Sequence, residues 1–302
     1  MSTTFRTAVV RTPGGPDSIE IIDVPVAKPG PGQVRVEIAG AAVNPVDLAL
    51  AAGVFHELGL IDQPDHTGLG WDFAGTVTAA GPDVDLPVGS RVAGLVAGFN
   101  RDFGTYAEQL VLPVRDTALV PDGLDLVSAA TVPLNGLAAA QIVDLLGDGG
   151  GRRLLVTGAA GAVGGYAVSL AQDRGWRVTG LARAQDEEFV RGLGADFTAE
   201  AGPGWDAVAD GAVLQEQGVI LVRDGGLFVG VQPGAAPADE RGITVRVVET
   251  EPDGARLAEL LDATASGRLP ARVHAVLPLD QVAKAHRAVA KGGVRGRYVL
   301  RP

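Results

Sequence analysis

Over the first 120 positions, short runs that resemble β-strands alternate with turns. Phe5–Arg11, Ser18–Val24 and Gln33–Ile38 are the first three of these runs. The runs are separated by segments rich in Pro and Gly, Pro13–Pro16 and Lys28–Gly32, which favour turns. The pattern therefore predicts a compact β domain over residues 1–120.

From Pro121 onward, helical segments alternate with short apolar runs. A helical stretch is predicted over residues 126–146, and six strand-like runs follow it. They are Leu154–Thr157, Arg177–Ala182, the residues that follow Gly194–Asp196, Trp205–Asp210, Gly226–Val231 and Ile243–Val248. Alternating strands and helices predict an α/β fold with a doubly wound parallel sheet, whose ligands bind at the carboxyl ends of the strands.

The end of the chain returns to a β-rich pattern. Strands are predicted at residues 273–277 and 297–300, with a helix at 280–290 between them. We therefore expect two domains. One is a β domain over residues 1–120 that residues 268–302 complete, and the other is an α/β domain over residues 121–267.

A glycine-rich turn follows the first strand of the predicted α/β domain. The pattern Ala159-x-Gly161-x-x-Gly164 connects that strand to a segment with helical spacing. Gly161 lets the backbone approach a phosphate, and Gly164 lets the helix pack close to the strand. Backbone N–H groups and the positive end of the helix dipole then face the anion. The residues predicted to bind a dinucleotide diphosphate are Gly158, Ala159, Ala160, Gly161, Ala162, Val163 and Gly164. The alternative is an ordinary strand-to-helix turn.

A basic residue follows the second strand of this domain. A site for NAD⁺ usually has an acidic residue about 20 positions beyond the glycines, which binds the ribose 2′-hydroxyl. Here Arg183 follows Leu181 and Ala182, and a guanidinium suits the 2′-phosphate of NADPH. We therefore predict NADPH as the cofactor, bound in part by Arg183 and by Val231 at the end of the fifth strand. The alternative for Arg183 is a solvent-exposed residue that opens the next helix.

Composition and charge exclude several classes of function. The 302 residues include 25 basic and 36 acidic side chains, for a formal charge of −11, so nucleic acid and anionic membranes are not expected as partners. No apolar run is long enough to span a bilayer, and residues 1–6 do not resemble a signal peptide. The chain has no Cys, which fits a reducing compartment and excludes thiolate ligands. We expect a cytoplasmic protein.

Seven short motifs, in the same order along the chain, resemble those of the medium-chain dehydrogenase/reductase superfamily in its zinc-independent quinone oxidoreductase branch. They are Asn44–Asp47, Gly70–Gly75, Val88–Val92, Gly104–Glu108, Ala159–Gly164, Gly194–Asp196 and Gly296–Leu300. The resemblance implies a GroES-like β domain joined to a Rossmann domain, with the active site in the cleft between them. It also implies a homodimer in which two Rossmann sheets join edge to edge, with Ile243–Val248 as the interface strand.

The resemblance also bears on metal binding. Zinc-dependent members of the superfamily use a Cys and a His-Glu pair at two positions where this chain has Asn44 and Trp71–Asp72. The four His residues form no close pair, so no metal site is predicted. The alternative is a metal site formed by His56, Glu57, His66 and Asp72. Without a Lewis acid, the expected reaction is hydride transfer from NADPH to an electrophilic acceptor, a quinone or an α,β-unsaturated carbonyl compound.

By the same resemblance, the catalytic residues are Asn44, Asp47 and Thr131. Asn44 and Asp47 would lie beside the nicotinamide and its ribose, and Thr131 would line the nicotinamide, so Asn44 and Thr131 also bind the cofactor. The alternatives are local: Asn44 and Asp47 cap the helix after Pro45, and Thr131 packs a helix. Relatives carry a Tyr shortly after the first motif, where this chain has Leu48–Leu50, so the proton is expected from solvent or Asp47.

Two other functions fit the same residues. One is a non-catalytic protein that binds NADPH as a redox sensor or a structural element, because one fold can host unrelated functions. The other is a reductase dedicated to one biosynthetic intermediate, which would turn over simple quinones poorly. Steady oxidation of NADPH by an acceptor separates the enzymes from a protein that only binds the cofactor.

Overall fold

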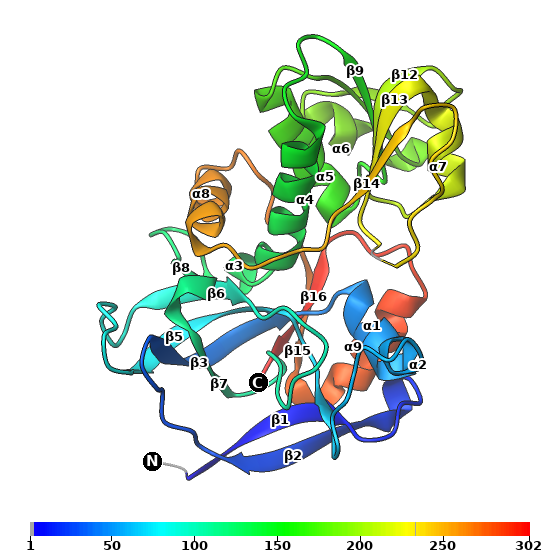
Figure 1. Ribbon diagram of the computed structural model, residues 1–302. Helices are drawn as coiled ribbons and strands as arrows, with labels where there is room; N and C mark the ends of the chain where they lie inside the picture. Colours follow the sequence, from blue (N-terminus) through cyan, green and yellow to red (C-terminus); the bar gives the residue numbers. More distant parts are fainter. Residues whose placement is uncertain (1–2, 233) are drawn as a thin grey trace. The chain divides into compact units, whose positions relative to one another are not determined.

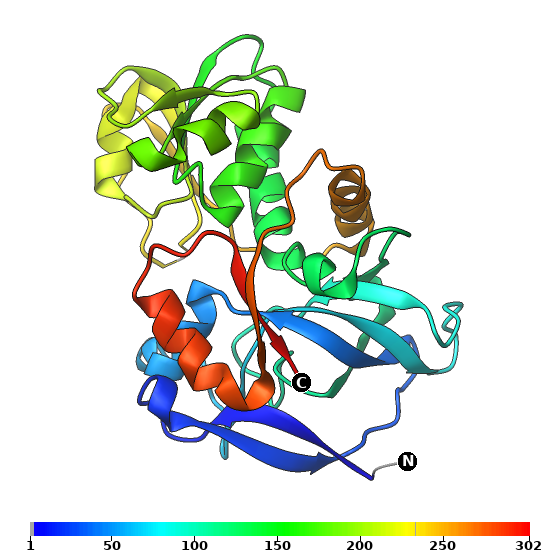
Figure 2. The ribbon, with the colours of Figure 1, turned by 180° about the vertical axis from the view of Figure 1, so that it is seen from behind.

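The computed structural model describes residues 3–232 and 234–302, and the chain divides into two compact units (Figure 1, Figure 2). The first unit holds the described residues up to Leu134 together with Pro252–Ser266 and Ala271–Pro302. The second unit holds the described residues of Asn135–Glu251 together with Gly267–Pro270. Each unit is built around its own sheet structure.

The first unit is a β domain with two sheets. The larger sheet has the order β15 (Val273–Pro278), β16 (Arg297–Arg301), β3 (Gln33–Ala42), β5 (Asp72–Ala80), β6 (Arg91–Leu95) and β8 (Thr117–Leu119), with β7 (Gln109–Pro113) also paired to β3. The smaller sheet has the order β2 (Ile19–Pro25), β1 (Thr4–Val10) and β4 (Thr67–Gly68). The pair β15–β16 is parallel, and the other pairs are antiparallel. This arrangement agrees with the predicted GroES-like β domain.

Short helices complete the first unit. They are α1 (Pro45–Ala52), α2 (Val54–Glu57), α3 (Leu126–Ala129), α8 (Gly254–Ala265) and α9 (Val282–Ala290), with 3₁₀ turns η1 (Pro16–Ser18), η2 (Val114–Asp116) and η4 (Leu279–Gln281). Strands and helices bury a common apolar core that includes Leu50, Leu69, Phe73 and Leu300. Within the described residues of the whole chain, no helix combines the length and the apolar character needed to cross a bilayer.

The second unit is a six-stranded parallel sheet with helices. Its strand order is β11 (Asp196–Thr198), β10 (Arg177–Leu181), β9 (Arg153–Thr157), β12 (Trp205–Asp210), β13 (Val222–Gly230) and β14 (Thr244–Val247). The helices are α4 (Pro133–Leu146), which begins at the end of the first unit, α5 (Ala162–Asp173), α6 (Glu187–Gly192) and α7 (Glu216–Leu221), with the turn η3 (Ala184–Asp186). Numbered along the chain, the strand order is 3-2-1-4-5-6, which is that of the Rossmann fold. The predicted doubly wound parallel sheet is confirmed.

The structure differs from the predicted elements in two places. The helix expected over residues 126–146 is interrupted between α3 and α4, because Pro133 lacks the N–H that a continuous helix requires and instead opens α4. Residues 268–270, expected in the β domain, group with the second unit, and residues 121–134 and 252–266, expected in the α/β domain, group with the first. There α8 packs against β8 so closely that a Cβ at Gly254 would lie 2.4 Å from Thr117 O.

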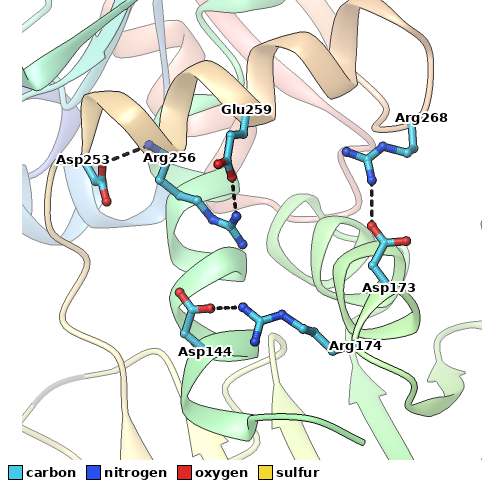
Figure 3. A network of polar contacts seen from close by, with 7 residues as sticks. All are labelled: Asp144, Asp173, Arg174, Asp253, Arg256, Glu259 and Arg268. Atoms are coloured by element: carbon cyan, nitrogen blue, oxygen red, sulfur yellow. Dashed lines mark hydrogen bonds and ion pairs between the residues drawn. The ribbon is translucent and has the colours of Figure 1, made fainter.

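Polar contacts fix the helix ends in both units (Figure 3). In the first unit, Asp253 accepts a hydrogen bond from Arg256 N at 2.9 Å and caps α8. In the second unit, Arg174 at the end of α5 pairs with Asp144 of α4 at 2.8 Å. Arg268 pairs there with Asp173 at 2.7 Å. These exposed ion pairs contribute little stability individually. We therefore attribute most of the stability of each unit to its apolar core and to the helix caps.

Candidate functional site

The turn between β9 and α5 has the geometry of a phosphate cradle. Gly158 has a φ of +62°, a left-handed conformation that favours glycine. A Cβ at Gly164 would lie 2.2 Å from Gly158 O, and a Cβ at Gly161 would lie 3.0 Å from the same oxygen. The turn therefore folds back on itself too tightly for larger residues. Gly161 is exposed and serves as the N-cap of α5, whose first N–H groups have no partner within the helix.

The alanines of the turn anchor this cradle to the sheet. Ala159 and Ala160 are buried, and Ala159 N donates to Leu181 O of β10 at 3.2 Å. A Cβ at Gly180 would lie 2.7 Å from Ala159 Cβ, so the Ala at the first position of the pattern fits because its neighbour is glycine. Ala162 and Val163 are partly exposed in the first turn of α5. All seven residues predicted to bind the diphosphate thus lie together in one turn.

A buried polar pair lies at the carboxyl ends of β9 and β12. Thr157 Oγ1 donates to Asp210 Oδ1 at 2.5 Å, and Ala212 N donates to Thr157 Oγ1 at 3.1 Å. Gln215 N donates to Asp210 Oδ2 at 2.9 Å. Strand order reverses between these two strands, which is where open α/β sheets bind ligands. Sequence reasoning missed this pair, although a polar residue ends each of the two apolar strands.

Arg183 and Val231 lie after two strands of the same sheet. Arg183 follows β10, and its side chain is 55% exposed and forms an ion pair with Asp186 at 3.6 Å. A half-exposed guanidinium in a long ion pair remains accessible to a phosphate group. Val231 follows β13 and is partly buried. Both predicted residues therefore belong to the carboxyl-end side of the sheet, as the glycine turn does.

In the first unit, Asn44 and Asp47 form the capping box of α1. Asp47 accepts hydrogen bonds from Asn44 N at 2.9 Å and from Gly70 N at 3.1 Å. Its side chain is buried, and this burial raises the pKa of the Asp47 carboxyl to about 6. The capping role that the sequence left as an alternative is therefore present, and it holds both residues in a fixed geometry.

Asp72 links two helix starts to β5. Its carboxylate accepts a hydrogen bond from Asn44 Nδ2 at 2.8 Å and another from Leu134 N, in the first turn of α4, at 2.5 Å. Burial raises the pKa of Asp72 to about 7, although both hydrogen bonds favour the charged form. Sequence reasoning named Asp72 within a motif and as an alternative metal ligand, and it gave Asp72 no role as a hydrogen-bond partner of Asn44. Its signal was an acidic residue at the start of an otherwise apolar strand.

Thr131 is buried just before α4, and its hydroxyl already donates a hydrogen bond to a neighbouring residue of the chain. Thr131 Oγ1 donates to Ser128 O of α3 at 2.8 Å. This bond stabilises the break between α3 and α4, so the packing role weighed for Thr131 is present. While the bond persists, the hydroxyl can contact a ligand only as an acceptor.

The proposed convergence of metal-binding residues is not found. Among the described residues, no group of three or more His, Cys, Asp or Glu side chains is arranged to hold a metal ion. Asp72, one of the two acidic members of the suggested set, is hydrogen-bonded to Asn44 and Leu134. His56 and His66 each retain ring nitrogens without a partner among the described residues. The Asp72 carboxylate thus serves as a hydrogen-bond acceptor and not as a metal ligand in this arrangement.

Two family models match the chain. The alcohol dehydrogenase GroES-like domain matches residues 30–122, and the zinc-binding dehydrogenase model matches residues 184–300. The alcohol dehydrogenase model lies within the first unit. The zinc-binding dehydrogenase model begins in the second unit and extends through residues of the first unit into β16.

Curated relatives are mostly longer than the matched region. The chain is 38% identical over 169 residues to the pikromycin polyketide synthase component PikAII of Streptomyces venezuelae, which covers 55% of the chain and 4% of that protein. It is 33% identical over 174 residues to the trans-enoyl reductase pgmF of Aspergillus terreus, covering 55% of the chain and 48% of the relative. The chloroplastic quinone-oxidoreductase homolog of Spinacia oleracea is 31% identical over 218 residues, 66% of the chain and 65% of the relative.

Solved structures match over the whole chain. The quinone oxidoreductase from Coxiella burnetii is 25% identical, with a TM-score of 0.87 over 99% of both chains. An NAD-dependent alcohol dehydrogenase is 30% identical, with a TM-score of 0.83 over 98% of this chain and 99% of that chain. The structural similarity thus covers both units of the chain.

Proposed function

Because the chain belongs to the medium-chain dehydrogenase/reductase superfamily, we propose that it transfers a hydride from NADPH to a quinone or an α,β-unsaturated carbonyl compound without a metal ion. The family consists of oxidoreductases that bind a nicotinamide dinucleotide. The proposal adds the choice of NADPH, the type of acceptor and the absence of a metal requirement.

The observation that carries the proposal is the pair of hydrogen bonds that the Asp72 carboxylate accepts in the first unit. An amide N–H and a helix N–H both donate to its carboxylate, so Asn44 and Asp72 act as a hydrogen-bonded pair. An amide nitrogen that donates a hydrogen bond is not a metal ligand. Without a Lewis acid to stabilise an alkoxide, an acceptor that is already electrophilic suits this unit better than a simple alcohol.

The residues of the second unit support a bound dinucleotide. The cofactor, when bound, supplies the hydride. The Gly158–Gly164 turn supports a diphosphate site, because the exposed Gly161 precedes the first N–H groups of α5, which can face an anion. Arg183, half exposed beyond β10, supports NADPH over NADH. These residues bind and orient the cofactor; the chain's own groups perform no covalent step in this proposal.

The relatives support a conjugated acceptor. Names among the similar proteins include a trans-enoyl reductase and quinone oxidoreductases, and both kinds of acceptor carry a C=C bond conjugated to a carbonyl group. A dedicated reductase of a biosynthetic intermediate is the second candidate, since a polyketide synthase component is also similar to the chain. For the location, we keep the cytoplasm as a proposal; the spinach relative is described as chloroplastic.

A rate measurement tests the proposal. Purified protein is mixed with NADPH and benzoquinone, cyclohexenone or an enoyl thioester, and the loss of NADPH is followed with and without EDTA. We expect steady turnover that EDTA leaves unchanged. Turnover of the enoyl thioester alone favours the dedicated reductase, and binding of NADPH without any turnover favours the sensor. Activity that EDTA removes and zinc restores contradicts metal independence.

We also propose that the chain forms a homodimer through the free edge of the second unit's sheet. The edge strand is β14, which pairs only with β13 among the described strands. An unpaired strand edge offers N–H and C=O groups to a second copy. The predicted interface, Ile243–Val248, includes this strand.

A further inference from the structure

The three Trp residues of the chain differ in how their indole N–H groups are used. Trp176 Nε1 donates to Gly147 O at 2.8 Å, and Trp205 Nε1 donates to Gly202 O at 3.0 Å. Trp71 is only 6% exposed, yet its Nε1 has no hydrogen-bond partner among the described residues. An indole N–H is a donor only, so it cannot be satisfied by accepting a bond. The free N–H of Trp71 therefore marks a place where an acceptor atom is missing.

Trp71 forms an aromatic cluster with Phe55 and Phe99. Phe99 meets the indole edge to face, with ring centroids 5.4 Å apart, and Phe55 stacks on Phe99 at 3.9 Å. Phe55 and Phe99 are partly exposed, whereas Trp71 is buried. The cluster thus extends from partly exposed rings to the free indole N–H. Planar conjugated molecules pack well against such rings.

A partly buried cation strengthens the indole as a donor. The Arg101 guanidinium lies 4.9 Å from the centroid of the Trp71 ring and donates to Gly70 O at 2.7 Å and to Val96 O. Burial lowers the pKa of Arg101 to about 10, so the group stays charged at neutral pH. A cation over the ring draws electron density toward it, and the polarised indole then donates a stronger hydrogen bond.

Trp71 is also next in sequence to a residue that contacts Asn44, which is predicted to be catalytic. It immediately precedes Asp72, whose carboxylate holds the Asn44 side chain at 2.8 Å. The indole and the Asn44–Asp72 pair therefore start from the same end of β5. Phe55 lies in α2, and Phe99 lies in the segment that follows β6.

We propose that Trp71 Nε1–H donates a hydrogen bond to the carbonyl oxygen of the acceptor, whose conjugated plane packs against the Phe55–Phe99–Trp71 cluster. This inference rests on the proposed function. The hydride of NADPH adds to the β-carbon of the acceptor, the C=C electron pair forms the enolate, and the negative charge collects on the oxygen that Trp71 contacts. A proton from solvent then adds to the α-carbon. Trp71 keeps its own proton and stabilises the charge that develops.

The first test compares two Trp variants. Trp71→Phe keeps an aromatic ring and removes the N–H, so we expect kcat to fall by about 100-fold while KM changes by less than roughly fivefold. The fall should be larger for cyclohexenone than for the more electrophilic benzoquinone. Trp205→Phe, which also removes an indole N–H, should keep wild-type rates. A kcat of Trp71→Phe equal to that of the wild type overturns the inference but leaves the proposed function standing.

The second test uses the wild-type protein and does not depend on turnover or on the folding of Trp71→Phe. The indole nitrogens are labelled with ¹⁵N, and p-nitrophenolate is added with NADP⁺ as a planar oxyanion that resembles the enolate. Trp176→Phe and Trp205→Phe assign the three indole signals. We expect the Trp71 N–H signal alone to move downfield. A Trp71 signal that stays in place at saturating phenolate overturns the inference, whatever the acceptor screen shows.

Discussion

Asp72 is buried inside the first unit, and its ionisation makes the free energy of unfolding depend on pH. Its pKa rises from 3.8 to about 7 in the folded chain because burial disfavours the charged form. Between these two values the folded state binds a proton that the unfolded state has lost. The free energy of unfolding therefore falls as the pH rises from about 4 to about 7, and the loss stays constant above that range.

We expect the substitution Asp72→Asn to remove most of this pH dependence. The amide keeps one acceptor for Asn44 Nδ2 or Leu134 N and carries no charge at any pH. At about 1.36 kcal/mol for each pH unit, the wild type should lose about 2–3 kcal/mol relative to the variant between about pH 5 and about pH 8. Urea denaturation at the two pH values measures this difference. A constant difference between the two proteins would falsify the raised pKa.

The proposed choice of NADPH depends on Arg183. Replacing it with Ala removes a charged hydrogen bond to the 2′-phosphate, so NADPH should bind about 1–3 kcal/mol more weakly, whereas NADH should bind almost unchanged. Fluorescence titration of both cofactors measures the effect. Arg191→Ala is the matched control, because Arg191 is also 55% exposed and paired with an acidic neighbour. Equal losses for both cofactors in Arg183→Ala would refute the assignment.

At the scale of elements, the start of α5 offers a matched pair of glycines. A Cβ at Gly164 would lie 2.2 Å from Gly158 O, whereas a Cβ at Gly165 would lie 3.6 Å from Ala159 O. We expect Gly164→Ala to push the helix away from the turn, with a loss of about 1–3 kcal/mol in stability and weaker NADPH binding.

Gly165→Ala should fold at least as stably as the wild type, because Ala is the better helix former and the site has ordinary contact distances. Thermal unfolding and NADPH titration of the two variants provide the comparison. A Gly164→Ala protein that binds NADPH like the wild type would show that the turn can relax, and that the close approach is not needed for the cofactor.

The elements that the sequence predicts well are those with a local cause. The strand of Trp205–Asp210 has the predicted limits, because a short apolar run between turns has few alternatives. Helix α8 was missed, and its place in the first unit depends on the approach of Gly254 to Thr117, which is remote in sequence. The break at Pro133 had a local signal, but the helical pattern around it outweighed that signal.

The same distinction applies to the candidate site. The glycine turn is contiguous in the chain, so its spacing alone indicates its place and shape. Asp72 with Asn44, and Thr157 with Asp210, meet across distant positions of the sequence. Their side chains can form hydrogen bonds, but the partner of each one becomes clear only from the fold. The unused N–H of Trp71 is visible only once every nearby acceptor is placed.

At the scale of the whole molecule, the proposed homodimer depends on the edge of the parallel sheet. Val248 N donates to Gly230 O of β13 at 2.9 Å. Alternate N–H groups of a strand point the same way, so Arg246 N also faces β13, and Val247 N faces the free edge of β14. A second copy that adds its own β14 would use that outward N–H group.

We expect the wild type to have twice the 30.8 kDa mass of one chain in solution and Val247→Pro to be monomeric. Proline removes the outward N–H of β14 while leaving the bonds to β13, so it should weaken pairing between copies more than the fold of one copy. Light scattering after size-exclusion chromatography measures the mass. Val247→Ala, which keeps the N–H and trims the side chain, should remain dimeric. If the proline variant keeps the wild-type mass, or if the wild type is itself monomeric, β14 is not the interface, and the parallel sheet ends at this strand in solution.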